Sequence, residues 1–184
     1  MRSETDPVRV DPRELPVDSF TDPDIARIAM VRMAESRAQN YGKFAQMVSE
    51  DLAQSGDYAR QAMRLENSVD ALFVQCAVIA ERVRGTSWEV IGEATRMSAA
   101  EAEAKWGGAE ARWRRASRAD NTYRKQPGVH AAAADRYLTT NAPHQFSTGR
   151  PLSASLDAAA HLTGRDAAAA DHAFAGASCT HCSR

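Results

Sequence analysis

Cysteine and long apolar segments are both scarce in this chain. Its 184 residues include three cysteines, too few for the disulfide framework of a small secreted domain. The most apolar stretch, residues 71–80, contains Gln75 and is far shorter than the roughly 20 apolar residues of a membrane-spanning helix. No apolar segment follows the first residues in the manner of a secretion signal. We therefore expect a cytoplasmic protein with reduced thiols and no membrane partner.

Motifs of enzymes and cofactor sites are also missing. The sequence has no glycine-rich phosphate loop, no nucleophile elbow and no His-Glu-x-x-His pair. These absences exclude the commonest nucleotide-binding, hydrolytic and metalloprotease classes. We predict that the chain is not an enzyme and binds no cofactor.

One pattern is metal-like. Cys179 and Cys182 have the spacing of a zinc-binding pair, and His161, His172 and His181 could supply nitrogen ligands. A structural zinc site needs four ligands at dependable spacing, and the sequence has no second Cys-x-x-Cys pair. A terminal pair without a metal is the simpler interpretation, and we predict no metal site.

Apolar residues recur at helical spacing and nowhere alternate as in a strand. Between Tyr58 and Arg84 they lie three or four positions apart, which predicts one continuous amphipathic helix of about seven turns. Another helix is predicted from Pro23, with Asp22 as its cap, to about Gln54. Two such helices favour a long antiparallel hairpin. The apolar surface of residues 58–84 favours a homodimer, with burial in the monomer core as the alternative.

The residues from Gly85 to Gly107 contain two helix starts eleven positions apart. Ser87 and Ser98 can each accept a hydrogen bond from a free backbone N–H at a helix N-terminus. Glu101, three residues after Ser98, completes a capping box. Two short helices joined by a tight turn are typical of a helix-turn-helix, predicted here at residues 86–106. The predicted fold class is therefore all-α: a long antiparallel helical hairpin followed by a helix-turn-helix, with flexible termini.

This segment resembles the helix-turn-helix of small actinobacterial regulators and of region-4-like sigma-factor modules. The matching residues are Trp88, Ile91 and Gly92 in the first helix, Met97 and Ser98 at the turn, and Ala102, Lys105, Trp106 and Gly107 in the second helix. Two residues depart from the pattern, since Thr95 replaces a leucine and Arg96 replaces the turn glycine. The resemblance implies that the second helix faces DNA with Ser98, Ala99, Ala100, Glu103 and Ala104, a set poor in the side chains that read bases.

A basic cluster follows at once. Residues 107–126 carry six basic and two acidic side chains, although the whole chain has a net charge of −1. Such a local cluster favours a polyanion as partner. The residues that we expect to contact phosphates are Arg96, Ser98, Lys105, Arg112, Arg114, Arg115 and Arg118. We predict a regulatory protein that binds DNA with weak sequence selectivity. The alternative is a protein-interaction or scaffold module with a degenerate helix-turn-helix that does not bind DNA.

Composition divides the chain into three parts. Residues 1–22 are rich in proline and acidic residues and are predicted to be a disordered lead-in. Residues 23–126 form the predicted helical domain. Residues 127–184 are rich in alanine, and we expect them to be partly helical or mobile.

Overall fold

We analysed a computed structural model of the chain, which describes residues 10–48, 54–141 and 152–159. The described residues form helices and connecting loops and contain no strand, which confirms the all-α prediction. The main helices are α1 (Asp22–Gln46), α2 (Asp57–Arg64), α3 (Ala71–Val83), α4 (Trp88–Thr95), α5 (Ala99–Arg115), α6 (Thr122–Lys125) and α7 (Pro127–Asn141). A π-helical segment, η3 (Leu65–Asp70), connects α2 to α3, and short 3₁₀ turns lie at Val17–Ser19 and Leu152–Ser155 (η4).

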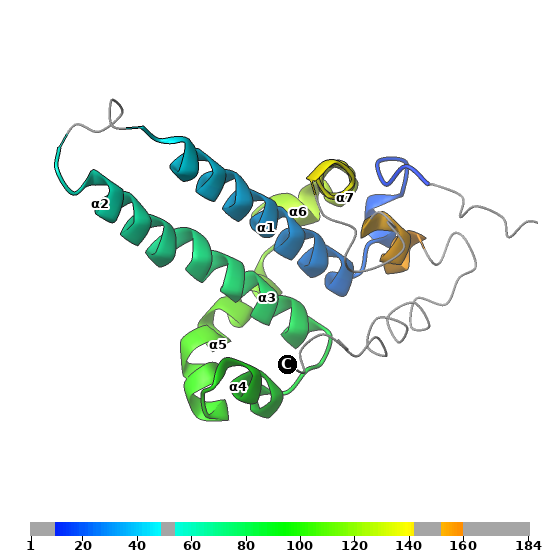
Figure 1. Cartoon of the computed structure of the whole chain (residues 1–184). Coiled ribbons are helices and arrows are strands. Elements are labelled where there is room, and N and C mark those ends of the chain that lie inside the picture. The colour runs from blue at the N-terminus through cyan, green and yellow to red at the C-terminus, as the bar shows by residue number, and fades with distance from the viewer. Residues whose placement is uncertain (1–9, 49–53, 142–151, 160–184) are drawn as a thin grey trace, which may run out of the picture.

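The helix α1 runs antiparallel to the 57–83 helix, which α2, η3 and α3 form together (Figure 1). Arg37 and Tyr41 of α1 tie the two helices together by binding the two carboxylate oxygens of Asp70, at 2.7 and 2.8 Å. Nearer the end of the hairpin, the Tyr58 hydroxyl donates to the Met47 carbonyl at 3.2 Å. The predicted hairpin is therefore present.

Both ends of α1 differ from the sequence prediction. Thr21, rather than Asp22, caps the helix, because its hydroxyl accepts from the Asp24 N–H while the Asp24 carboxylate accepts from the Thr21 N–H. The helix ends at Gln46, short of the predicted Gln54, and Met47 is extended. None of the described residues 30–48 is buried, so tertiary packing adds little that would prolong the helix.

The 57–83 helix has the predicted extent but is not a regular α-helix. Its π-helical segment η3 widens one turn in the middle, and the Ser68 hydroxyl donates to the Arg64 carbonyl there at 2.6 Å. Only Leu65 and residues 78–80 are buried. The rest of the predicted apolar face is half-buried or exposed, with contacts to α1 such as that between the Tyr58 and Phe44 rings, whose centres are 6.2 Å apart.

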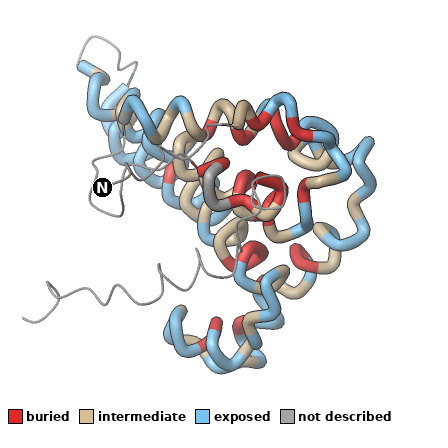
Figure 2. The backbone as a smooth tube through the Cα atoms, turned by 90° about the vertical axis from the view of Figure 1, so that its right-hand side faces the viewer, coloured by how far each residue is buried: buried red, intermediate tan, exposed pale blue. Residues whose placement is uncertain are grey.

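Three clusters of buried residues make up the core. The first joins Leu15, Phe20 and Ile28 to α7 and to residues 152–159. The second lies between α1, α3 and α5, and the third holds α4 and α5 against Val78. Trp113 of α5 packs against both the first and the second cluster. Figure 2 shows the buried residues gathered where these helices meet, while the far end of the hairpin is exposed or intermediate.

Residues on both sides of the predicted boundaries at 22 and 127 share the first cluster. Leu15 and Phe20 are buried, although they belong to the segment predicted as a disordered lead-in. Ala131, Ala134 and Leu156, from the predicted alanine-rich region, pack in the same cluster as Ile28 of α1. The apolar side chains of these flanking segments thus complete the core that α1 alone leaves open. Residues 1–9 and 160–184, the outer parts of the two flanking segments predicted at 1–22 and 127–184, lie outside the described residues.

Candidate helix-turn-helix surface

The helices α4 and α5 form the predicted pair of capped helices. The Ser87 hydroxyl accepts from the Val90 N–H at the start of α4, at 3.5 Å. The Ser98 hydroxyl accepts from the Glu101 N–H at the start of α5, and the Glu101 carboxylate accepts from the Ser98 N–H at 2.8 Å. Both caps are those that the serine spacing predicts.

The turn between α4 and α5 has the left-handed conformation that the family pattern assigns to glycine. Arg96 adopts φ +58° and ψ +41° and is the only residue other than glycine with positive φ among the described residues. The Met97 N–H donates to the Gly92 carbonyl at 2.9 Å across the turn. The backbone therefore keeps the helix-turn-helix course despite the arginine, at a conformational cost of about 1–2 kcal/mol.

Gly92 allows α4 and α5 to approach closely. A Cβ atom at this position would lie 2.7 Å from the Met97 carbonyl oxygen and 3.0 Å from the Ala99 nitrogen. Both atoms belong to the backbone of the turn and cannot move aside without disturbing it. The interface between α4 and α5 is completed by Ile91, Ala102 and Trp106, which pack in one cluster with Val78 of α3.

The second helix extends beyond residue 106, the predicted end of the helix-turn-helix. The helix α5 continues through Gly107 and Gly108 to Arg115. Glycine costs about 1 kcal/mol in a helix relative to alanine. Ala109 and Trp113 pack against α1 and α3, and this tertiary packing outweighs the two glycines.

The face of α5 that resembles a DNA-reading face carries small and acidic side chains. Ser98, Ala100, Glu103 and Ala104 are exposed, as expected from the resemblance, and Ala99 is partly buried. Base readout normally uses Arg, Lys, Asn or Gln with paired hydrogen bonds. This set contains none of them, so it cannot make such contacts.

The N-terminus of α5 already holds a carboxylate. Besides accepting from the Ser98 N–H, Glu101 accepts from the Ser98 hydroxyl at 2.7 Å. These hydrogen bonds, the one from the Ser98 hydroxyl first, lower the pKa of Glu101 below the ordinary glutamate value. The Ser98 hydroxyl hydrogen is thus directed to Glu101, not to the phosphate that the sequence prediction assigns to it, and the anion site of this helix end is filled from within the chain.

The predicted phosphate-binding cations fall into two groups. Arg114 is held by Glu110, with hydrogen bonds of 2.9 and 2.8 Å, and Arg118 pairs with Asp18. Arg96, Lys105, Arg112 and Arg115 are exposed and make no ion pair within the described part of the chain. The Lys105 ammonium lies 4.8 Å from the centre of the Trp106 ring. Four of the six predicted cations are therefore available to a ligand.

An ion-pair cluster around the buried Glu110, which the sequence did not reveal, joins α3 to α5. Glu110, 8% exposed, accepts from Arg82 at 3.0 Å and from Arg114. The Arg82 guanidinium also donates to the Thr86 carbonyl at 2.6 Å and lies 4.5 Å from the centre of the Trp88 ring. Burial raises the pKa of Glu110, but the two arginines together outweigh burial and hold the pKa below the ordinary glutamate value.

An open cleft of about 410 Å³ lies beside this ion pair. Trp88, Arg82 and Arg114 line it together with Glu103, Gly107, Gly108, Glu110 and Ala111. The i, i+4 spacing of Glu110 and Arg114 was a local signal for part of this cluster. Nothing local in the sequence links either residue to Arg82, 28 positions before Glu110.

Comparisons with known proteins do not place this chain in a family. No family model, no curated protein and no solved structure matches this chain. The resemblance to actinobacterial regulators and sigma-factor modules therefore stays a prediction.

Among the described residues, no helix has the length and apolar character needed to span a bilayer. Nor do the described ranges contain a cluster of three or more side chains that could hold a metal ion. The zinc-like residues Cys179 and Cys182, with His161, His172 and His181, lie outside these ranges.

Proposed function

We propose that the chain is a protein-interaction module whose α4–α5 unit contacts a basic surface of a regulatory partner. The acidic character of the exposed helix-turn-helix surface carries this proposal. Four glutamates occupy exposed positions on α4 and the first two turns of α5: Glu89, Glu93, Glu101 and Glu103. Two of them, Glu89 and Glu93, lie on the helix that in a DNA-bound helix-turn-helix crosses the phosphate backbone. Carboxylates there repel a polyanion and attract a basic protein segment.

Apolar side chains between the glutamates suit a protein partner. Val90 is 55% exposed, and Ala94, Ala100 and Ala104 are exposed as well. An interface core that excludes water needs such side chains, with charges at its rim. Base edges offer little apolar surface beyond the thymine methyl group.

Site-specific photo-crosslinking in host cells tests this proposal. Benzoylphenylalanine replaces Ala104 on the α4–α5 surface or, as a control, the exposed Ala45 of α1. We expect one discrete protein adduct from position 104 that is absent from position 45 and lost in the Glu93→Lys/Glu103→Lys variant. A nucleic-acid adduct alone, or a protein adduct that persists after charge reversal, would contradict the proposal.

DNA binding is the second candidate, supported by the free cations of α5. Lys105 and Arg112 are seven residues apart, two helical turns, and so share one side of α5 with the nearby Arg115. These side chains could contact phosphates without reading bases, which gives salt-dependent and weakly selective binding.

A titration of a DNA duplex at two salt concentrations tests this candidate. We expect the Arg112→Ala/Arg115→Ala variant to bind less tightly and to reduce the slope of log K against log salt by about 2. The Arg13→Ala/Arg60→Ala variant is the matched control, since each of these arginines pairs with an aspartate nearby in the chain. Absence of binding at low salt, or equal loss in both variants, would end this candidate.

The remaining predictions concern assembly and chemistry. A cytoplasmic location and the lack of enzymatic activity and of a cofactor stay predictions of the sequence. We also propose self-association through residues 58–84, supported by the exposed apolar side chains Tyr58, Met63, Leu72 and Val74.

A further inference from the structure

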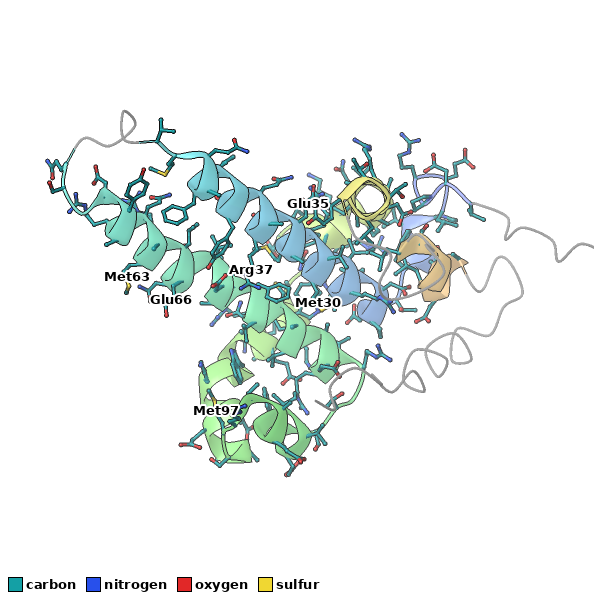
Figure 3. All side chains as sticks on the ribbon, in the orientation of Figure 1. Met30, Glu35, Arg37, Met63, Glu66 and Met97 are labelled. Carbon is teal, nitrogen blue, oxygen red and sulfur yellow. The ribbon has the colours of Figure 1, made fainter. Side chains whose placement is uncertain are left out.

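No element of the described ranges covers one face of the 57–83 helix along most of its length. Five exposed residues, at spacings of four, four, four and three, form a row on this face: Ala59, Met63, Asn67, Ala71 and Val74. The next residue of the row, Val78, is buried against Ile91 and Trp106. The face that α4 and α5 cover at Val78 is therefore open from Ala59 to Val74. Figure 3 shows Met63 projecting from this helix on the side away from α1.

The π-helical segment keeps the row straight. In a regular α-helix, residues four apart drift around the axis, because one turn takes 3.6 residues. η3 lies in the middle of the row and has wider turns, so residues four apart stay closer to one line across it. π-Helical segments are rare in proteins, and those that occur are often found at functional sites. The row thus presents a continuous strip without any charged side chain.

The side-chain sizes along the row are complementary to those of a second, antiparallel copy of the same row. Asn67 lies at the centre. Met63 and Ala71 lie four residues to either side of it, and Ala59 and Val74 lie eight and seven residues away. Two such rows in antiparallel orientation place a large side chain opposite a small one at each step, and Asn67 opposite Asn67. Alternation of large and small side chains is what close helix packing requires.

We infer that a second copy of the chain covers this row, with the two 57–83 helices antiparallel and crossing at Asn67. This inference rests on the proposed self-association and specifies its geometry. A two-fold axis at Asn67 makes the contact isologous, so each copy uses the same residues. The two Asn67 amides can hydrogen-bond to each other, as polar residues in helical interfaces do when they fix register.

The position of α4 and α5 selects the antiparallel orientation. Both helices lie on the row side of α3, beyond the open strip (Figure 1). In a parallel pair the two α4–α5 units would meet in the same space. In an antiparallel pair centred on Asn67, Val78 lies opposite Gly56 of the other copy, so the two α4–α5 units lie at opposite ends of the contact.

The length of the row sets the expected strength of the contact. From Ala59 to Val74 it extends about 24 Å at 1.5 Å per residue. A single helix–helix contact of this length buries less than the roughly 800 Å² per partner of a standard interface. We therefore expect a weak dimer whose population rises with protein concentration.

Sedimentation velocity of the full chain from about 1 to 200 µM tests the inference. The wild type is expected to shift from monomer to dimer over this range. Ala71→Arg places a charge in the centre of the contact and is expected to keep the chain monomeric. Ala45→Arg, on the exposed side of α1, is the matched control and is expected to dimerise normally. Circular dichroism should show unchanged helix content in both variants, since both sites are exposed.

A size exchange tests the antiparallel register. Met63→Ala leaves a gap opposite Ala71 and is expected to weaken the dimer about tenfold. In Met63→Ala/Ala71→Met, residues 63 and 71 of the two copies again place one large side chain opposite one small one. This double variant is expected to restore wild-type association. A double variant no tighter than Met63→Ala would overturn the register.

The outcomes separate this inference from the broader proposal. A wild-type dimer that Ala71→Arg leaves intact would overturn the inference, while self-association through another face would stand. A chain that stays monomeric at the highest concentration would contradict both.

Discussion

At the scale of single residues, Arg96 has the most unusual backbone conformation among the residues that the structure describes. It holds a left-handed backbone conformation that costs a side-chain-bearing residue about 1–2 kcal/mol and costs glycine almost nothing. Because Arg96 is exposed and makes no ion pair within the described residues, its side chain offers little to offset that cost. We expect Arg96→Gly to raise the free energy of unfolding by about 1 kcal/mol, measured by urea denaturation.

A second arginine provides the control for this prediction. Arg64 is also exposed but has ordinary helical angles, with φ −67°. Arg64→Gly is therefore expected to lower the free energy of unfolding by about 1 kcal/mol. If both glycine variants were destabilised equally, the conformation of Arg96 would carry no strain.

At the scale of helices, two glycines with opposite surroundings test how closely α4 and α5 pack. Gly92→Ala would force a Cβ atom within 2.7 Å of the Met97 carbonyl oxygen, so we expect a loss of about 2 kcal/mol or more. A Cβ atom added to Gly42 of α1 would meet nothing within 4 Å, and Gly42→Ala should gain up to about 1 kcal/mol from helix propensity. Thermal unfolding of both variants measures the contrast. Two shifts of the same sign would contradict the close approach.

The ion pair between α3 and α5 makes a pH-dependent contribution to stability. Because Arg82 and Arg114 hold the pKa of Glu110 below the ordinary glutamate value, this stability is present at neutral pH and is lost as the pH falls through the folded pKa. We expect Glu110→Gln to lower the free energy of unfolding by about 1–3 kcal/mol at pH 7. The difference in unfolding free energy between Glu110→Gln and the wild type should become smaller as the pH falls below the ordinary pKa range of glutamate.

Denaturant titrations at several pH values measure this gap. Glu103→Gln is the matched control, since Glu103 is exposed on the same helix and makes no ion pair within the described part of the chain. Its unfolding free energy should stay close to that of the wild type at every pH. A gap for Glu110→Gln that stays constant with pH would show that the ion pair does not titrate with folding.

The helices that the sequence predicted well are those fixed by local chemistry. Ser87, Ser98 and Glu101 act within three residues of themselves, so their spacing was enough to predict both caps. Contacts between distant residues could not be predicted in this way. The pairing of Glu110 with Arg82 depends on how α3 crosses α5, and the passage of α5 through Gly107 depends on packing further along the helix. The acidic α4–α5 surface was visible in the sequence, but which cations remain free was not.

At the scale of the whole molecule, distant segments of the chain complete one core. The Asp24 carboxylate, which helps to cap α1, also accepts from the Asp157 N–H at 2.8 Å and from the Ala158 N–H at 3.3 Å. Burial raises the pKa of Asp24 above the ordinary aspartate value, and the hydrogen bonds from Thr21 and from the Asp157 N–H oppose the rise. Composition placed Asp24 and Asp157 in different parts of the chain, because alanine-rich sequence gives no sign of what it packs against.

This joint core leads to a prediction about Leu156. Its side chain is fully buried beside Ile28 of α1 and Ala134 of α7, so Leu156→Ala removes contacts to both helices. We expect a loss of about 2–5 kcal/mol in one cooperative transition, measured by denaturant unfolding followed by circular dichroism. Leu72→Ala is the control, because Leu72 is 47% exposed and should cost much less. Equal effects of the two substitutions would mean that residues 152–159 do not belong to the core. A larger loss of stability at Leu156 would show that the folded unit extends well past the domain boundary predicted at residue 127.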